Sequence, residues 1–215
     1  MKPAGRVKIK WSPNFAYAIG LLTTDGNLSS NGRSILFSSK DEEQIKNFLK
    51  CLNIENAIGL NKSGAGNTSL RVQVGDIQFY NFLVKLGLTP AKSKTIDKLS
   101  IPNRYFFDFV RGHFDGDGTF YSYWDKRWKS SFMFYIELTS ASKAHITWLQ
   151  NRIILLSSII GKITKSKNNS VFRLKYAKAE SLKLLAKLYY NPEVICLSRK
   201  RQKIEKALAV IGMEL

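Results

Sequence analysis

The sequence predicts an α+β protein made of two pseudo-symmetric halves, each with the element order αββαββα. Three observations predict this fold. Similar segments recur in the same order along the chain, and their Asp-Gly pairs at Asp25 and Asp117 are 92 positions apart. Each segment has helical or strand-like periodicity. A stretch rich in proline, serine and lysine separates the two sets. The repeat therefore indicates two copies of one structural unit.

The first two pairs of segments supply helices and a strand to each half. Residues 12–28 (SPNFAYAIGLLTTDGNL) and 103–120 (NRYFFDFVRGHFDGDGTF) are both apolar, both have helical character, and both run into Asp-Gly. Residues 35–49 and 136–150 each begin as a strand that ends in serine and continue as an amphipathic helix. We therefore expect a helix, a strand and a second helix in this order in both halves.

The remaining segments complete each half with a hairpin and a third helix. Asn31-Gly32 and residues 64–67 have the composition of tight turns. The matched segments are 61–74 with 164–176, which aligns Arg71 with Arg173, and 77–88 with 179–190, which aligns Lys85 with Lys187. Each half is thus predicted to be helix, hairpin, helix, hairpin, helix.

Residues 89–103 (TPAKSKTIDKLSIPN) are the predicted linker, because they contain prolines, serines and lysines without sustained apolar periodicity. The expected boundary lies near residue 98. An N-terminal half with its linker is then predicted for residues 1–98, and a C-terminal half for residues 99–215.

The charge of the chain indicates a polyanionic partner. Lys and Arg number 34 against 16 Asp and Glu, which gives a formal net charge of +18. Solubility does not require so large a charge. The basic residues are dispersed among aromatic and small polar residues instead of gathering in one amphipathic helix, so nucleic acid is favoured over a membrane surface. A merely basic or ribosome-associated protein is the alternative that composition leaves open.

The sequence also indicates where the protein works in relation to the cell. Cys51 and Cys196 are 145 positions apart, with no further Cys or His at ligand spacing, so both are predicted to be reduced. No apolar run approaches the length of a membrane span, and the first residues lack the apolar stretch of a signal peptide. We expect an intracellular protein, in a bacterial cytoplasm or an organelle matrix, that is not secreted and has no membrane partner.

Small residues on the two Asp-Gly helices predict that these helices pack on each other. Gly20 with Thr24, and Gly112 with Gly116, recur at a spacing of i and i+4, which allows two helix backbones to approach closely. Such packing brings the helix ends, with Asp25 and Asp117, together on the pseudo-symmetry axis. Two carboxylates in that position repel each other unless cations bridge them, and Mg²⁺ prefers such hard oxygen ligands. For a single Asp-Gly, a simple turn after a helix is the better interpretation; the duplication favours a site.

The segments AIGLLTTDG (18–26) and VRGHFDGDG (110–118) resemble the signature of the LAGLIDADG homing endonuclease family. Two copies in one chain resemble its monomeric, pseudo-two-fold members, and the resemblance runs from about residue 13 to residue 206. It implies antiparallel, saddle-shaped sheets with the two LAGLIDADG helices packed at the interface. The first copy departs from the pattern, because Thr23 stands where the second copy has Asp115. Asp115 is accordingly predicted to have a structural or capping role.

The resemblance implies a Mg²⁺-dependent endonuclease that cuts both strands of a long, asymmetric DNA target and leaves short 3′ overhangs. Ca²⁺ is expected to substitute for Mg²⁺ in binding, and Mn²⁺ in activity. The implied residues are Asp25 and Asp117 as catalytic metal ligands, the carbonyls of Thr24 and Gly116 as further metal contacts, and Lys92 and Lys200 as basic catalytic residues, with Lys94 and Arg199 as near alternatives; Ser39 and Ser140 fill the polar position before each second helix.

The same resemblance implies that alternate residues of each hairpin face double-stranded DNA. Because the two halves differ at almost every such position, the target is expected to be asymmetric. The predicted DNA-binding residues are Asn27, Ser29, Arg33, Ser38, Lys62, Asn67, Arg71 and Gln73 in the first half, and Tyr121, Tyr123, Arg127, Lys129, Lys165, Lys167, Asn169, Arg173 and Lys175 in the second, with Trp124 and Trp128 as further candidates.

The resemblance also leaves an alternative function open. An intron RNA maturase, or a nucleic-acid-binding protein without activity, would use the same scaffold, so intron RNA is a second possible partner. Loss of activity usually removes acids, and both motif aspartates are present, which favours an intron-encoded, monomeric nuclease. The two histidines, His113 and His145, lie on predicted helices and are interpreted as packing residues or hydrogen-bond donors.

Overall fold

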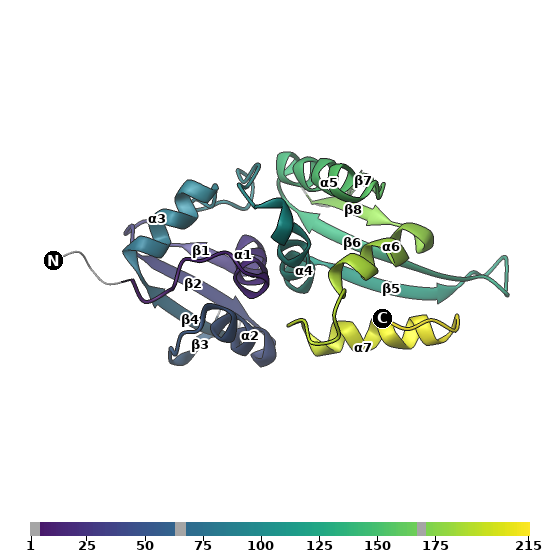
Figure 1. Cartoon of the computed structure of the whole chain (residues 1–215), viewed down its shortest axis with the longest axis horizontal. Coiled ribbons are helices and arrows are strands. Elements are labelled where there is room, and N and C mark those ends of the chain that lie inside the picture. Colours follow the sequence, from purple (N-terminus) through teal and green to yellow (C-terminus); the bar gives the residue numbers. More distant parts are fainter. Residues whose placement is uncertain (1–4, 63–67, 167–170) are drawn as a thin grey trace.

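The first half has the predicted order of elements (Figure 1). The computed structural model describes residues 5–62, 68–166 and 171–215. Pro13 at the first helical position, and Ser12, whose side chain accepts a hydrogen bond from the Phe15 N–H, fix the start of the first helix. The elements are α1 (Pro13–Asp25), β1 (Gly26–Leu28), β2 (Ser34–Ser39), α2 (Glu42–Leu52), β3 (Ile58–Lys62), β4 (Thr68–Gly75) and α3 (Ile77–Leu86).

The second half repeats this order and then adds a helix. A short 3-10 turn, η1 (Asn103–Tyr105), leads into it. The elements are α4 (Phe106–Asp117), β5 (Thr119–Trp124), β6 (Phe132–Ser140), α5 (Lys143–Ser157), β7 (Lys162–Lys165), β8 (Phe172–Tyr176), α6 (Lys178–Leu188) and α7 (Ser198–Ala209). The repeat in the sequence does not predict α7, the additional element.

The two halves contain sheets of the same topology. The strand orders are β1-β2-β4-β3 and β5-β6-β8-β7, and all pairs are antiparallel. In each sheet, alternate residues are buried beneath helices while their neighbours point outward. The predicted α+β class with two pseudo-symmetric antiparallel halves is therefore confirmed.

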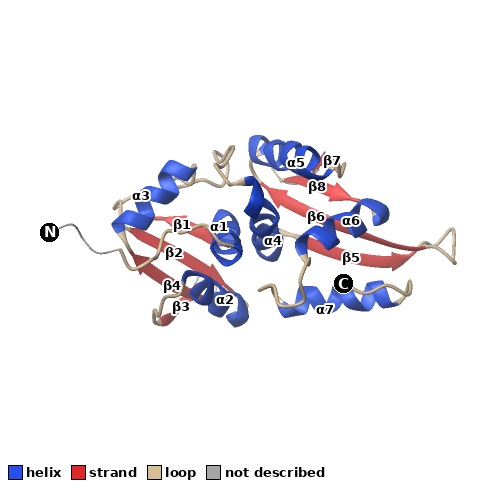
Figure 2. Ribbon diagram, viewed as in Figure 1, coloured by secondary structure: helices blue, strands red, loops and turns tan. Residues whose placement is uncertain are grey.

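The helices α1 and α4 lie side by side at the centre of the molecule, between the two sheets (Figures 1 and 2). Both are buried along most of their length, so they form the interface of the halves and part of both cores. Aromatic side chains join each core to its second helix. Phe37 of β2 stacks on Phe48 of α2 at 4.4 Å between ring centroids, and Phe109 of α4 meets Trp148 of α5 edge-to-face at 5.8 Å.

The segment between the halves is anchored to the protein. Gly87, with φ 113°, ends α3 in the left-handed conformation, and the chain then runs irregularly to η1. Three apolar side chains of this segment, Ile96, Leu99 and Ile101, are buried. The predicted linker is thus a loop that packs on the folded halves.

Within the described parts of the chain, no helix is long and apolar enough to cross a membrane, and Cys51 and Cys196 are both free thiols, as predicted.

Candidate metal centre at the junction of the halves

Glycine allows the backbones of α1 and α4 to touch. A Cβ built on Gly20 would overlap the carbonyl oxygen of Phe109 and lie 2.7 Å from the His113 nitrogen. A Cβ on Gly112 would overlap the Tyr17 carbonyl in the same way. These distances leave no room for a side chain larger than hydrogen. The small-residue stripe predicted from the sequence is therefore the contact surface of the two helices.

The same contact joins the two Asp-Gly ends. A Cβ built on Gly116 would overlap the Thr24 side chain and lie 2.8 Å from Asp25 Oδ2. Asp25 is the last residue of α1, and Asp117 is the last residue of α4. The structure therefore brings the ends of the two helices, with the two predicted metal ligands, together, and Thr24 and Gly116 touch each other there.

The Asp25 carboxylate lies in an environment that disfavours its charge. Its Oδ2 accepts a hydrogen bond from Thr24 Oγ1 at 3.2 Å and from Gln44 Nε2 at 3.4 Å. Burial, followed by the negative charge of Asp117, raises the pKa of Asp25 to about 6. A hydrogen bond from Thr24 and the charges of the nearby lysines oppose that rise. A divalent cation would relieve the repulsion between the two carboxylates.

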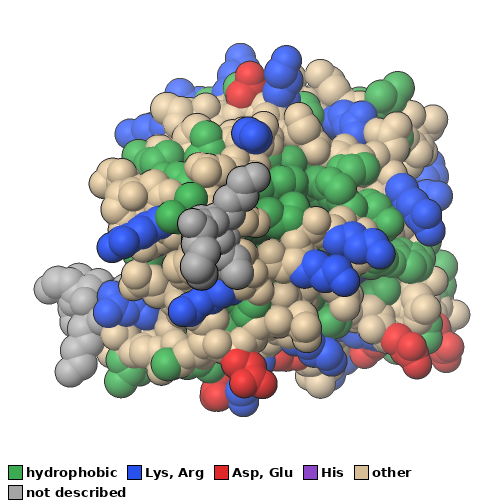
Figure 3. All heavy atoms as spheres, turned by 60° about the vertical axis from the view of Figure 1, so that its left-hand side comes forward, with side chains coloured by type: hydrophobic (Ala, Val, Ile, Leu, Met, Phe, Trp, Pro, Cys, Tyr) green, Lys and Arg blue, Asp and Glu red, His purple; other side chains and the backbone are tan. Residues whose placement is uncertain are grey.

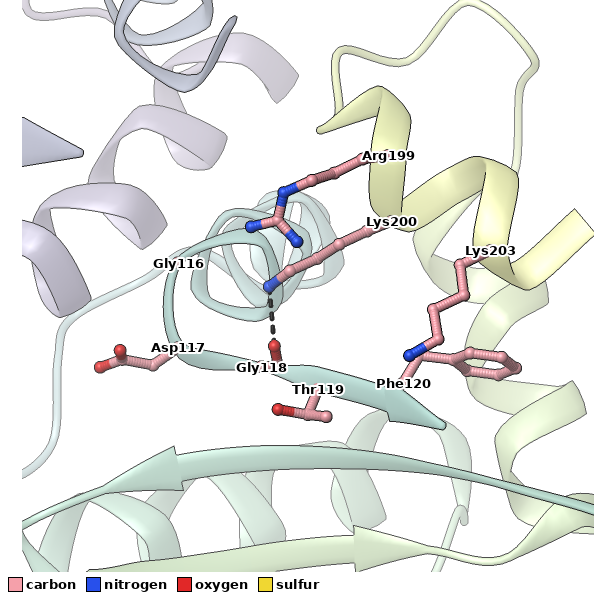
Figure 4. A pocket seen from close by; sticks show the side chains of 8 residues that line it. All are labelled: Gly116, Asp117, Gly118, Thr119, Phe120, Arg199, Lys200 and Lys203. Atoms are coloured by element: carbon pink, nitrogen blue, oxygen red, sulfur yellow. Dashed lines mark hydrogen bonds between the residues drawn. The ribbon is translucent and has the colours of Figure 1, made fainter. Parts of the chain in front are cut away.

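Asp117 lines two cavities at the helix end. One, of about 370 Å³, is formed with Lys200, Arg199 and other residues of α7 and β5; the other, of about 240 Å³, includes Thr23 and Thr24 of the first half. In Figure 4 the Lys200 side chain runs from α7 to the turn after α4, while the Asp117 carboxylate projects away from Lys203. Burial raises the pKa of Asp117 as well.

Two buried lysines hold the turns that follow the aspartates. Lys92 donates to the Gly26 carbonyl, and Lys200 donates to the Gly118 carbonyl at 2.7 Å and to those of Phe114 and Asp115. Only 5% of Lys92 and 8% of Lys200 is exposed. Burial lowers the pKa of both ammonium groups to about 8, while the charges of the site's acids oppose the change. The structure thus places both predicted lysines at equivalent positions of the two halves.

The alternatives to these lysines have other surroundings. Lys94 is exposed in the loop after α3. Arg199 forms an ion pair with Asp41 of the first half, with Nη2 and Oδ2 2.7 Å apart.

The serines before α2 and α5 shape the chain where these helices begin. Ser39 Oγ accepts from the Asp41 N–H at 3.0 Å, and Ser140 Oγ accepts from the Ser142 N–H at 3.1 Å. These contacts form turns, and the helix N-caps are Asp41 and Ser142 instead. Ser39 also donates to Gln44 Oε1 at 2.7 Å.

Gln44 is a site residue that the sequence reasoning missed. It lies in the first turn of α2, is 3% exposed, and links Ser39 to Asp25. A polar residue on the face of an amphipathic helix that otherwise points to the core is a signal that could have revealed it.

Asp115 has the structural role predicted for it. Its fully buried carboxylate accepts from the Tyr17 hydroxyl at 2.7 Å and from the Leu197 N–H at 2.8 Å. The second bond reaches the residue immediately before α7. The histidines also have the predicted packing role, because the His113 and His145 rings stack at 5.4 Å between α4 and α5 and both are buried.

The outward face of the first sheet carries the predicted polar residues. Asn27 and Gln73 lie on either side of Leu36 in the sheet, and Ser38 is paired with Arg71. The polar residues Asn27, Ser38, Arg71 and Gln73 each alternate with buried neighbours along their strands. Arg33 and Ser29 lie at the hairpin turn next to these strands. Lys62 lies in β3, opposite Thr68. Three further predicted residues, Asn67, Lys167 and Asn169, lie outside the described residues.

The outward face of the second sheet is more aromatic. Tyr121 stacks on Tyr135 at 5.2 Å, and the Lys175 ammonium lies 3.9 Å from the centroid of the Tyr135 ring. The predicted residues Tyr123 and Arg173 share this face, and Arg127, Lys129 and the indoles of Trp124 and Trp128 are exposed at the tip of the β5–β6 hairpin.

One basic position of the second sheet differs from the predicted alternation. Lys165 pairs with Phe172 and lies over its ring, whereas Lys162 pairs with the outward Lys175. The register thus favours Lys162 over Lys165 as the outward residue. The region of surface shown in Figure 3 carries many more Lys and Arg than Asp and Glu side chains.

The donor set at the helix ends fits a hard divalent cation. Two carboxylates meet there, and the last carbonyls of a helix have no partner within that helix. Mg²⁺, Ca²⁺ and Mn²⁺ take such oxygen ligands and complete their shells with water or substrate phosphate. Among the described residues, no group of three or more His, Cys, Asp and Glu side chains could hold a metal. A cation here would therefore depend on Asp25, Asp117 and backbone oxygens.

Solved structures at low sequence identity have the same fold. The homing endonuclease I-WcaI bound to its DNA recognition sequence is 15% identical, with a TM-score of 0.62 over 92% of this chain and 88% of that chain. I-DmoI in complex with DNA and Mn is 16% identical, with a TM-score of 0.54 over 83% and 97%. Full-length DUF199/WhiA from Thermatoga maritima is 14% identical, with a TM-score of 0.59 over 97% of this chain, which covers 65% of the WhiA chain.

These likenesses show that the chain has the LAGLIDADG fold, and the resemblance predicted from its two motifs is confirmed at that level. The N-terminal domain of WhiA is also called a LAGLIDADG domain. The fold is therefore shared by homing endonucleases and by WhiA, and it does not define an activity by itself. No protein-family model matches the sequence, and no curated protein sequence matches it either.

Proposed function

We propose that this protein is a site-specific homing endonuclease that hydrolyses phosphodiester bonds in both strands of a long DNA target, with Mg²⁺ as cofactor and short 3′ overhangs as product. The observation that carries the proposal is the meeting of Asp25 and Asp117 at the ends of two touching helices, each beside a buried lysine. Burial and the charge of Asp117 raise the pKa of Asp25, and a bound divalent cation would offset this cost.

Each group in the site has a task in this reaction. The carboxylates of Asp25 and Asp117, with the carbonyls of Thr24 and Gly116, would hold the metal, which supplies an activated water and charge neutralisation when bound. Lys92 and Lys200 place positive charge beside the turns where scissile phosphates would lie. Gln44 and Thr24 orient the Asp25 carboxylate through their hydrogen bonds.

The two outward sheet faces support double-stranded DNA as the substrate. The two sheets lie on either side of the helix pair (Figure 1), so a duplex that contacts both would cross the junction, and basic side chains on these faces suit phosphate. The first face offers amide and guanidinium groups through Gln73 and Arg71, while the second is built from tyrosines such as Tyr121 and Tyr135. Faces of such different chemistry favour an asymmetric target over a palindrome.

The architecture supports a monomeric enzyme whose halves are residues 1–98 and 99–215. One chain already contains both aspartates and both sheets, so a second copy is not needed to complete the site. We include an intron-encoded origin and action inside the cell in the proposal.

The likeness to DUF199/WhiA, a protein that is not described as a nuclease, favours a second candidate: DNA or intron RNA binding without cleavage.

A cleavage assay distinguishes the two candidates. Supercoiled plasmid that carries the candidate insertion site is incubated with the protein in Mg²⁺, in Mn²⁺ or in Ca²⁺. We expect linear product with Mg²⁺ and Mn²⁺, and binding without cleavage with Ca²⁺. Tight binding of DNA or intron RNA with no cleavage under any of these ions would favour the second candidate.

The pH dependence of cleavage follows from the titration of the acids and lysines. Asp25 must be ionised to bind metal, and its pKa is raised to about 6, so the rate should rise as the pH increases through that value. Bound metal favours the ionised form and can move this limb to lower pH. The pKa of Lys92 and Lys200 is lowered to about 8, so the rate should fall above pH 8 as they lose their charge. A single-turnover rate that is flat from pH 5 to 9 would contradict these roles.

A further inference from the structure

The helix that carries Lys200 begins against the other half of the protein. Arg199 Nε and Nη2 donate to the Asp41 carboxylate at 2.7 to 3.1 Å, which is a bidentate ion pair. Glu43 accepts from the Ser198 N–H at 3.1 Å and from the Ser198 hydroxyl. Asp41 is the N-cap residue of α2, and Glu43 lies in its first turn. The first turn of α7 is therefore bound to the first turn of α2.

This contact replaces a cap that α7 lacks. The N-cap position of α7 is Leu197, whose side chain makes no capping hydrogen bond. A helix N-terminus leaves backbone N–H groups without partners and favours nearby negative charge. Here Asp115 binds the Leu197 N–H from within the second half, and Glu43 binds the Ser198 N–H from the first half. The first half thus supplies part of the cap of a helix in the second half.

A third bond extends the contact to the chain before α7. Asn47, one turn further along α2, donates from Nδ2 to the Cys196 carbonyl at 2.9 Å. Together, the three α2 side chains hold residues 196–199. Lys200 follows directly, and its ammonium reaches three carbonyls at the end of α4. A shift of the first turn of α7 would therefore move Lys200 relative to Asp117.

The other half shows the same arrangement with different side chains. Ser142, the N-cap of α5, donates to the Ile96 carbonyl at 2.5 Å, and the His145 ring nitrogen lies 2.8 Å from the Asp97 carbonyl. The Ile96 N–H in turn donates to the Lys92 carbonyl at 2.8 Å. The segment that follows Lys92 is thus held by the second helix of the opposite half. In both halves, therefore, the second helix holds the segment next to the lysine of the other half, although the side chains that do so are of different types.

We propose that each half positions the active-site lysine of the other, and that Asp41, Glu43 and Asn47 are positioning residues for Lys200. The buried position of the Lys200 ammonium explains why its helix must be held. The Lys200 ammonium is satisfied by carbonyl oxygens in a fixed place, and a flexible four-carbon side chain keeps that place only while its helix is held. Under this proposal the two halves must be correctly docked before the second lysine is in place.

The first test needs neither DNA nor metal. The double variant Asp41→Ala/Glu43→Ala and the wild type are treated with an amine-methylating reagent, and modification of each lysine is followed by mass spectrometry. We expect Lys200 to react about tenfold faster in the variant, because opening a locally held segment exposes it, while Lys92 stays protected. Glu42→Ala is the matched control, since Glu42 lies on the same helix and forms an ion pair within that helix, with Lys46.

The outcomes of this test are decisive in both directions. Unchanged protection of Lys200 in the double variant overturns the proposal. Faster reaction of Lys92 and Lys200 together also overturns it, because it indicates that the whole interface has opened. Glu43→Gln keeps one carbonyl acceptor for Ser198, so in an Asp41→Ala background it should restore part of the protection that Glu43→Ala removes.

The second test rests on the proposed nuclease function. Cutting of each strand of the target is timed separately, and the double variant should slow one strand about 10- to 100-fold, so that nicked plasmid accumulates. The Glu42→Ala control should cut both strands at the wild-type rate. Equal slowing of both strands, or of neither, would overturn the positioning role. If the wild type does not cut at all, the nuclease function fails while the methylation result still stands.

Discussion

Asp117→Asn is expected to abolish double-strand cleavage, with a loss of at least about a thousandfold in rate, while DNA binding stays close to that of the wild type. Asparagine keeps the size of the side chain and removes the charge that a divalent cation needs. Binding depends on the polar side chains of the outward sheet faces, which this substitution leaves unchanged. The measurements are single-turnover cleavage in Mg²⁺ and binding affinity in Ca²⁺.

The control for this prediction is Asp125→Asn, which neutralises an acid in the β5–β6 hairpin, away from the helix ends. It should cut at nearly the wild-type rate. If Asp117→Asn instead loses both binding and the folded state, the residue is structural, and the catalytic assignment is wrong.

The substitution Asp25→Asn should stabilise the metal-free protein. Because the pKa of Asp25 is raised, its ionised form destabilises the fold; this cost is absent below about pH 4 and fully present above about pH 6. At pH 7, Asp25→Asn should therefore raise the free energy of unfolding by about 1 to 2 kcal/mol, after allowance for solvent screening. Adding Mg²⁺ should stabilise the wild type more than the variant.

Gly20→Ala is expected to reduce the free energy of unfolding by about 4 kcal/mol or more. The added Cβ would meet backbone atoms of Phe109 and His113, which cannot move aside as a flexible side chain can. The helices would have to separate, and Asp25 would move away from Asp117. Chemical denaturation measures the loss.

A matched change that meets no backbone is available at Gly59. A Cβ there would lie 3.9 Å from the Arg71 side chain, an ordinary contact, so Gly59→Ala should change stability by less than about 1 kcal/mol. If Gly20→Ala were as stable as Gly59→Ala, the two helices would not be in backbone contact.

Most of the fold could be predicted from the sequence because two copies of one pattern support each other. Either Asp-Gly helix alone is ambiguous, but the order of the hairpins and helices that follow is shared. The helix α7 was missed because SRKRQKIEKALA reads as a solvated charge run. Its few buried positions, among them Lys200 and Ile204, become apparent only when the helix lies against the second half.

The sequence repeat located the site residues that occur in both halves. It could not locate contacts that occur in one half alone. Asp25 and Asp117, and the lysines after each third helix, stand at matching places in both copies. Gln44 has a histidine, His145, at the aligned position, so the repeat gave no hint of its role. The ion pair of Asp41 and Arg199 joins residues 158 positions apart, and no local pattern encodes such a contact.

The central claim is that the helix pair brings Asp25 and Asp117 together to share divalent cations over one DNA duplex. A crystal structure of the protein with duplex DNA and Mn²⁺, with the ions located by their anomalous scattering, tests it most directly. The account predicts anomalous peaks within coordination distance of both carboxylates and of the DNA backbone, about 2.0 to 2.4 Å from the oxygens. Peaks elsewhere, or carboxylates that face away from the duplex, would contradict it.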